Sequence, residues 1–428
     1  MSQATPGQTG AESARPVAPS AAAASPARPS IVADRIKRIK LSPSVAARAI
    51  IAELREQGRR IIDLTIGEPD FSTPEHIRQA ATAAMNRGET KYPPAQGTVA
   101  LRKAARGHLL EATGVDYPVA RIIVSTGAKL VIFNGLAATL NDGDEVLIPA
   151  PFWVSYPDMV LVNDGVPVVV PCPEADGFKL TPHALERAIT PRTKWLLLNS
   201  PSNPTGAMYS AAELRALGEV LARHPHVWLM TDEIYEHLAY GDQRHVSPAA
   251  AVPELAGRTL TVNGVSKAYA MTGWRLGYAG GPKALIKAMA TLISQSTSCV
   301  SAISQAAARV ALTADQACVA EAAALFHARR DRIVAGLNEA PGIRCPQPQG
   351  AFYVYPSVAG LLGRRSPAGH LLQSDLDVVL FLLDEAGVAV LDGAAYGLSP
   401  YLRLSFATSM ENIEEGCRRI VQACGRLT

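Results

Sequence analysis

Along most of the chain, short apolar runs alternate with amphipathic stretches. Apolar residues at helical spacing predict helices over IIAELREQG (50–58) and KLVIFNGLAATL (129–140). Apolar, β-rich runs that end in turn residues predict strands at RIIVSTG, DEVLIPA, PVVVPC, KWLLLNSP, VWLMTDE, RTLTVNG and RLGYAGG. Because a helix-like stretch usually follows each strand, we expect an α/β fold with a mostly parallel mixed sheet flanked by helices.

The pattern changes near residue 335. A helical stretch from about 313 to 338 precedes GAFYVYP and YLRLSFATS, which predict strands of a smaller unit. We therefore expect a large domain over 71–335 and a smaller α+β domain formed by 31–70 and 336–428. Residues 1–30, rich in Ala, Pro and Ser, predict a disordered tail because they contain little that could be buried. A transit peptide is the alternative, although the prolines oppose an amphipathic helix.

Composition narrows the function mainly by exclusion. The chain is 48% hydrophobic and 18% charged, as expected of a soluble globular protein. A net charge of +3 without a basic cluster argues against nucleic acid as a partner. Scattered cysteines without a C-x-x-C pair fit a reducing cytoplasm. No apolar run approaches the roughly 20 residues that span a bilayer, so no membrane association is expected.

No nucleotide-binding or metal motif occurs in the sequence. The patterns G-x-G-x-x-G, G-x-x-x-x-G-K-[ST] and H-E-x-x-H are all missing. The HPH segment, His224 to His226, precedes a predicted strand and has no acidic residue close to it in the sequence. It is interpreted as a pair of loop histidines, and no metal site is expected.

The stretch SKAYAMTGWR places Lys267 among small and apolar residues, with Arg275 eight positions later. Uncharged surroundings disfavour an ammonium, which leaves an amine closer to the nucleophilic form needed for a Schiff base. The guanidinium of Arg275 is suited to a bidentate phosphate contact. A reactive aldehyde with a phosphate, such as pyridoxal 5'-phosphate (PLP), would use both groups. A solvent-facing lysine in a loop is the alternative.

Polar residues follow two earlier strands. Asp232 comes directly after an apolar run, and Asn203 lies in the turn of LLLNSPSNPTG. An aspartate there is suited to hold a pyridine nitrogen protonated, while Asn203 and Tyr235 are suited to bond a phenolic oxygen. A helix cap for Asp232 and an Asn-Pro turn for Asn203 are the alternatives.

Taken together, these segments resemble the class I aminotransferases of PLP fold type I, and within them the bacterial aspartate aminotransferase branch. The resemblance covers nearly everything from 34 to 424. It rests on GVSKAYAMTGWRLG and on IGEPDF, TKYPPAQG, PAPFWVSYPDM, SNPTG, TDEIYEHL, GAFYVYPS and YLRLSFATS, which occur in the family's order. It implies PLP as cofactor and a large and a small domain.

The resemblance also implies roles around the cofactor. Lys267 would be the Schiff-base lysine and general base, Asp232 the partner of the pyridine nitrogen, and Tyr235 and Asn203 the partners of the phenolic oxygen. Trp153 would stack on the ring. The phosphate ligands would be Arg275, the backbone of Gly127 and Ala128, and Tyr92 of a neighbouring subunit, which implies a homodimer with shared active sites.

For the substrate, the resemblance implies that Arg403 holds the α-carboxylate and Lys129 the side-chain carboxylate. Gly67, Trp153 and Asn203 would also contact the substrate. The chain departs from the family pattern at Ala128, where a second glycine is common, and at Ala46 and Cys299, where threonine and asparagine are usual. These departures leave the choice of amino acid less constrained than the chemistry.

The resemblance therefore implies transfer of an amino group from L-aspartate to 2-oxoglutarate, giving oxaloacetate and L-glutamate. An aromatic or prephenate aminotransferase is the alternative within the same chemistry. A PLP-dependent β-lyase shares the fold but needs no acceptor oxo acid. A regulator with an aminotransferase-like domain is opposed by the presence of every catalytic residue type.

Overall fold

The computed structural model describes residues 31–428, so the tail predicted over 1–30 lies outside the described residues. A seven-stranded sheet of order β2-β8-β7-β6-β5-β3-β4 forms its centre. The strands are β2 (Ile122–Ser125), β3 (Glu145–Ala150), β4 (Val166–Pro171), β5 (Thr193–Asn199), β6 (Trp228–Asp232), β7 (Thr259–Gly264) and β8 (Gly277–Gly280). Only β8 runs antiparallel to its neighbours, which confirms the predicted mostly parallel mixed sheet.

Both faces of this sheet are buried. On β5, Trp195 and Leu197 pack into one apolar cluster, while Leu196 and Leu198 pack into another, as the period of two in a strand requires. The first cluster includes α5 (Ala128–Ala137), α6 (Ser155–Val162) and α10 (Lys283–Ser296). The second includes α7 (Pro182–Ala188) and α8 (Ala211–Arg223). Helices on both faces explain why the strands are apolar almost throughout.

Further helices cover the β2 and β8 end of the sheet. They are α3 (Glu75–Asn86), α4 (Val99–Thr113) and α11 (Ala302–Thr313). The short helix α9 (Pro248–Ala251) lies between α4 and α8. Helix α4 has clear sequence limits: the Thr98 hydroxyl accepts a hydrogen bond from the Leu101 amide, and Gly114 ends the helix at φ +69°. It contacts β2, β8 and α9.

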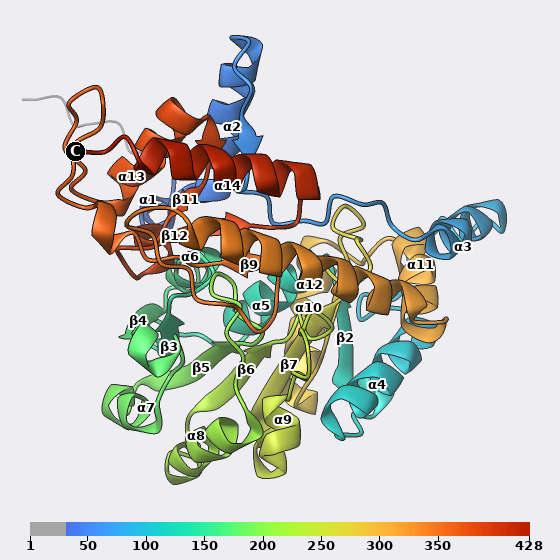
Figure 1. Cartoon of the computed structure of the whole chain (residues 1–428). Helices are drawn as coiled ribbons and strands as arrows, with labels where there is room; N and C mark the ends of the chain where they lie inside the picture. Colours follow the sequence, from blue (N-terminus) through green and yellow to red (C-terminus); the bar gives the residue numbers. More distant parts are fainter. Residues whose placement is uncertain (1–30) are drawn as a thin grey trace, which may run out of the picture.

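Smaller sheets lie above the large one (Figure 1). Strand β1 (Ile62–Asp63) pairs with β10 (Val388–Ala389), and β12 (Leu402–Ser405) lies between β11 (Leu391–Asp392) and β9 (Tyr353–Val354). The helices here are α1 (Asp34–Lys37), α2 (Pro43–Glu56), α12 (Ala317–Asn338), α13 (Asp375–Phe381) and α14 (Met410–Cys424). The β1–β10 pair joins the N-terminal and C-terminal segments, as expected of a unit built from both.

The predicted domain change near residue 335 falls inside α12, which is one continuous helix. The same apolar cluster contains Phe326 of α12, Ile413 of α14 and Tyr235 from the turn after β6. The domain limits therefore stay a prediction. Within residues 31–428, no helix combines the length and apolar composition that crossing a membrane requires.

Candidate active site

The predicted site residues come from segments that meet at one edge of the large sheet. Parallel strands β3, β5, β6 and β7 end at this edge, and so does β2, because the intervening β8 is antiparallel to both β2 and β7. Strand β8 begins there. Loops at the carboxyl ends of strands are the usual position of ligand sites in such sheets. The topology thus collects side chains that are far apart in the sequence.

A cavity of about 380 Å³ lies at this edge. Its volume falls within the range of about 300–1,000 Å³ typical of small-molecule sites. The predicted residues that line it are Gly67, Ala128, Lys129, Trp153, Asn203, Asp232, Tyr235, Lys267, Arg275 and Arg403. Gly127 is adjacent to it, whereas Tyr92 does not line it and is 91% exposed in the single chain.

Lys267 extends into the cavity from the turn that follows β7. Its Nζ donates a hydrogen bond of 2.6 Å to the carbonyl oxygen of Gly67. The pKa of Lys267 is lowered to about 8, mainly by burial and also by the charges of Arg275 and Arg403, against the opposing charges of Glu68 and Asp232. An amine with this pKa is partly neutral near pH 7, as a nucleophile or base requires.

The loop after Lys267 is fastened to the segment that contains IGEPDF. The Thr272 hydroxyl donates to Glu68 Oε2 at 2.6 Å, and the Trp274 indole donates to the Thr73 hydroxyl at 2.9 Å. Thr73 in turn donates to the carbonyl oxygen of Ala270 at 2.7 Å. Ala270 has a positive φ of +48°, a conformation that needs such support outside glycine. These bonds fix the direction of the lysine.

Asp232 ends β6 and is buried at the floor of the cavity. Burial raises the pKa of its carboxyl to about 6, although Tyr156 donates a hydrogen bond of 2.7 Å to Oδ2. The side-chain amide of Asn199 donates to the backbone oxygen of Asp232 at 2.8 Å, and Asn199 Oδ1 accepts from the backbone N–H of Asn203 at 2.8 Å. A carboxyl held in this way fits a protonated ring nitrogen, because a buried acid needs a cationic or donating partner.

An anion-binding corner lies where β2 turns into α5. Gly127 occupies the N-cap position at φ +87°, and a methyl group there would come within 2.7 Å of Arg275 Nη2. The guanidinium of Arg275 donates only to the carbonyl oxygen of Thr272 and forms no salt bridge within residues 31–428. Ser266 also lines the cavity. A helix N-terminus beside an unpaired guanidinium fits a phosphate.

Arg403 lies in β12 on the other side of the cavity and is 3% exposed. Its Nη2 donates to the carbonyl oxygen of Thr65 at 2.5 Å and its Nη1 to Asn203 Oδ1 at 3.5 Å, while Nε has no partner among the described residues. The guanidinium lies over the rings of Tyr353 and Tyr396, at 4.6 Å and 5.2 Å. A buried guanidinium without a carboxylate is costly, so the site favours a carboxylate ligand.

Tyr235 is buried beside the lysine. Its hydroxyl lies 3.0 Å from that of Tyr353, and Lys267 Nζ lies 5.7 Å from its ring centre. Burial raises the pKa of Tyr235 well above its usual range. The hydroxyl therefore stays protonated at neutral pH and remains a hydrogen-bond donor.

Lys129 and Trp153 form the outer wall. The Lys129 Nζ lies 4.7 Å from the ring centre of Trp153, as in a cation–π contact. Partial burial lowers the pKa of Lys129, and so does the charge of Arg275. Arg48 of α2 also lines the cavity, and its Nη2 lies 3.4 Å from Glu68 Oε1. Basic side chains outnumber acidic ones in the cavity lining.

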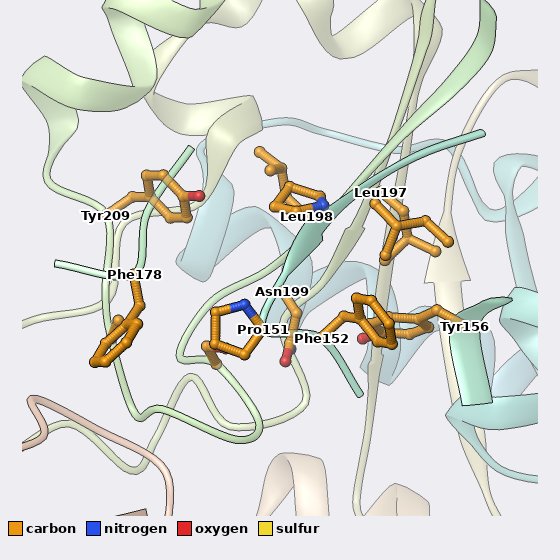
Figure 2. A pocket seen from close by; sticks show the side chains of 12 residues that line it. Pro151, Phe152, Tyr156, Phe178, Leu197, Leu198, Asn199 and Tyr209 are labelled. Carbon is orange, nitrogen blue, oxygen red and sulfur yellow. The ribbon is translucent and has the colours of Figure 1, made fainter. Parts of the chain in front are cut away.

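A second, much smaller cavity lies behind this floor. Figure 2 shows Phe178 and Tyr209 on one side of it and Phe152 and Tyr156 on the other, with Asn199 between them. Its volume of about 20 Å³ has room for a single water molecule only. Because Tyr156 and Asn199 line both cavities, the small one belongs to the supporting structure of the larger site.

Sequence reasoning missed several side chains that line the cavity: Arg48, Glu68, Tyr156, Ser266 and Tyr353. Four of them carried a signal. Ser266 is next to Lys267, Glu68 is next to Gly67 in IGEPDF, Tyr156 lies three residues after Trp153 in PAPFWVSYPDM, and Tyr353 lies in GAFYVYPS. Arg48 lies outside these segments, and no local pattern indicates its position.

The residues present fit PLP. The cavity has an amine for the aldehyde at Lys267, an acid for the ring nitrogen at Asp232, a flat aromatic face at Trp153, and the corner of Gly127 and Arg275 for the phosphate. The close approach of Gly127 and Arg275 supports this interpretation most directly, because a side chain at Gly127 would collide with the Arg275 guanidinium.

Comparisons with known proteins agree with this geometry. An aspartate aminotransferase of Rhizobium meliloti (strain 1021) is 52% identical over 92% of this chain and 97% of its own length. An aspartate/prephenate aminotransferase of Cereibacter sphaeroides is 51% identical over 93% of this chain and 99% of its own.

A crystal structure of the aspartate aminotransferase from Rhizobium meliloti superimposes with a TM-score of 0.91, covering 93% of this chain and 99% of that one at 52% identity. The expected fold type I of PLP enzymes is therefore confirmed. The family model described as aminotransferase class I and II matches residues 59–420. The chain belongs to the class I and II aminotransferase family.

Proposed function

We propose that this aminotransferase binds PLP and transfers the amino group of L-aspartate to 2-oxoglutarate, giving oxaloacetate and L-glutamate. The observation that carries the proposal is the position of Lys267, whose amine has a pKa of about 8 and shares the cavity with two guanidiniums, Arg275 and Arg403. Neither guanidinium forms a salt bridge within residues 31–428. One guanidinium is suited to the cofactor phosphate and the other to the α-carboxylate of an amino acid.

Lys267 acts as the base in this proposal. PLP, when bound, supplies the aldehyde that takes the amino group and a ring that accepts the electrons left at the substrate Cα. The amine of Lys267 would be the general base that takes up the proton released from the substrate Cα. Its lowered pKa keeps a useful fraction neutral near pH 7.

The neighbouring side chains hold charge and orientation. Asp232 would hold the ring nitrogen of bound PLP protonated, and Tyr156 fixes its carboxylate by a 2.7 Å hydrogen bond. Tyr235 and Asn203 would hold the phenolic oxygen, and Trp153 would stack on the ring. Their common effect is to stabilise negative charge that develops during proton transfer.

The substrate carboxylates are assigned to two cations. Arg403 binds the α-carboxylate, because it is buried and lacks a carboxylate partner within residues 31–428. Lys129, at the cavity mouth beside Trp153, binds the side-chain carboxylate of aspartate. Gly67 contributes backbone contact near the lysine.

We also infer a homodimer with shared sites. Tyr92 is 91% exposed and does not line the cavity of its own chain, so its hydroxyl is free to reach a second copy. Large apolar side chains of the N-terminal segment are exposed as well, among them Ile31 and Leu41. Burial of such residues between subunits is typical of homodimers. A cytoplasmic location remains a prediction.

A two-substrate assay tests the function. Purified enzyme with PLP is given L-aspartate and 2-oxoglutarate, and oxaloacetate and L-glutamate are measured. We expect sustained turnover with both substrates and a single half-turnover when 2-oxoglutarate is omitted. Lys267→Ala serves as the inactive control. Sustained release of ammonia and pyruvate without an oxo acid would instead identify a β-lyase, and no product with any amino acid would refute the proposal.

Prephenate is the second candidate acceptor. It is favoured by the name of the Cereibacter sphaeroides relative and by Arg48, an additional cation at the mouth of the cavity. Rates with 2-oxoglutarate and prephenate, each paired with L-aspartate, decide between the two. Aromatic amino acids belong in the same screen.

A further inference from the structure

Two histidines and a glutamate converge outside the active site. His108 lies on α4, and Glu236 and His237 lie in the turn after β6. The Nε2 atoms of His108 and His237 are 3.3 Å apart, and Glu236 Oε1 is 2.7 Å from the first and 3.4 Å from the second. Three potential metal ligands thus point at one small volume.

These separations are close to those of a zinc site. Ligand atoms that lie about 2.0–2.1 Å from a tetrahedral zinc are about 3.3 Å from one another. Two of the three distances match, and the third requires the carboxylate to move outward by about half an ångström. Two imidazoles and one carboxylate are a ligand set that zinc commonly takes, with a fourth position left for water.

Hydrogen bonding leaves this cluster incomplete. Glu236 is 8% exposed, and its Oε1 accepts no aligned hydrogen bond from the described residues although His108 Nε2 lies 2.7 Å away. A protonated His108 offsets part of the cost of this buried carboxylate. A divalent cation between Oε1 and the two imidazoles would take over that role and bind all three groups.

The second ring nitrogen of His108, Nδ1, has a hydrogen-bond partner, as is usual for a metal-binding histidine. The hydroxyl of Tyr278 lies 2.9 Å from His108 Nδ1, which leaves Nε2 directed at the cluster. Metal-binding histidines usually have such a partner, which fixes the ring orientation. The His237 side chain is 32% exposed and provides access from solvent, whereas that of His108 is 10% exposed.

The neighbouring group of Glu233 and His245 is less suited to a metal. Glu233 Oε1 accepts from the hydroxyls of Thr231 and Ser247, and its Oε2 lies 2.9 Å from His245 Nε2. The oxygens of Glu233 are thus engaged by protein partners. The cation site is therefore assigned to the other cluster.

We propose that His108, Glu236 and His237 bind one zinc-type divalent cation, which ties α4 to the turn that follows Asp232 and contains Tyr235. The site is separate from the catalytic one, because none of the three ligands lines the central cavity. The proposal does not depend on the identity of the amino acid substrate.

The test uses untagged holoenzyme stripped with EDTA and dialysed into metal-free buffer. Zinc is titrated calorimetrically, and bound zinc is measured after gel filtration. We expect one zinc per chain and a Tm that rises by about 3 °C at a hundredfold excess over Kd. His108→Gln and His237→Gln should each weaken binding at least about tenfold, since even partners of ligands account for about 10- to 100-fold.

His224→Gln is the matched control. His224 Nε2 lies 2.9 Å from Glu186 Oε1, an acidic partner that the sequence did not indicate. Within residues 31–428 this pair has no third potential ligand. The control should bind zinc as the native enzyme does. Two results would overturn the assignment. One is that native enzyme binds no zinc at micromolar concentration. The other is that His237→Gln binds zinc as well as native enzyme does; the partly exposed position of His237 makes misfolding of this variant a poor explanation.

Discussion

The reactivity of Lys267 depends on its surroundings, and removing one nearby charge tests that dependence. Burial is the largest cause of its pKa of about 8, and the charges of Arg275 and Arg403 add to it. Arg403→Gln keeps a polar side chain in β12 but removes the positive charge. We therefore expect the pKa of Lys267 to rise in this variant.

The size of the native effect is large. The pKa falls from an ordinary 10.5 to about 8, which corresponds to about 3 kcal/mol of free energy between the charged and neutral amine. At pH 7 the neutral fraction is then about 10%, against about 0.03% for an ordinary lysine. The folded environment thus supplies about 300 times more reactive amine.

The rate at which apoenzyme recombines with PLP reports this amine, because only the neutral form attacks an aldehyde. PLP is removed, and the recombination rate is followed by cofactor absorbance between pH 6 and pH 10. In the native protein we expect the rate to rise with pH and level off near pH 8. The levelling point should move to higher pH in Arg403→Gln.

Arg48→Gln serves as the matched control. Arg48 lines the same cavity, but its side chain is 58% exposed, so solvent screens its charge more than that of the buried Arg403. Its profile should follow that of the native protein. A native profile that levels off only near pH 10, or the same profile in Arg403→Gln and native protein, would refute the reasoning.

Three other changes test the remaining contacts. Asp232→Asn removes the partner of the ring nitrogen and should lower kcat about a thousandfold or more, measured with L-aspartate and 2-oxoglutarate; a loss below tenfold would contradict the assigned role. Tyr156→Phe removes the 2.7 Å hydrogen bond that lowers the pKa of Asp232, so this pKa should rise. The acidic limb of the pH profile of kcat/KM should then move to higher pH, and an unchanged limb would show that the bond has no effect. Tyr92→Phe should weaken PLP retention, measured by equilibrium dialysis. Tyr401→Phe, at a partly exposed tyrosine that does not line the cavity, is the control, and equal retention by Tyr92→Phe and native enzyme would argue against a shared site.

Local sequence patterns predicted the strands well because their signals are strong. The apolar run of β5, for example, is buried on both faces, so its length and composition alone indicate a central strand. The strand order was not predictable in the same way. The antiparallel direction of β8 follows from how RLGYAGG packs between β2 and β7, which no local pattern contains.

The sequence likewise predicted some of the chemistry of the site, whereas other contacts became known only from the structure. The neighbours of Lys267 in the sequence predicted a reactive amine, and the end of an apolar run predicted a buried carboxyl at Asp232. The Tyr156 contact was not predicted, because it joins α6 to β6 across 76 positions. The His108 cluster was missed because its ligands come from α4 and a turn more than a hundred residues later.

The sequence by itself determined which residues are reactive in kind and at which strand ends they lie, because these properties depend on near neighbours. Only the tertiary structure decided how reactive they are. Lys267 meets the Gly67 carbonyl across 200 positions, and Arg403 meets Asn203 across another 200. Burial and charge at such distances exist only after folding, and they set the pKa of the lysine.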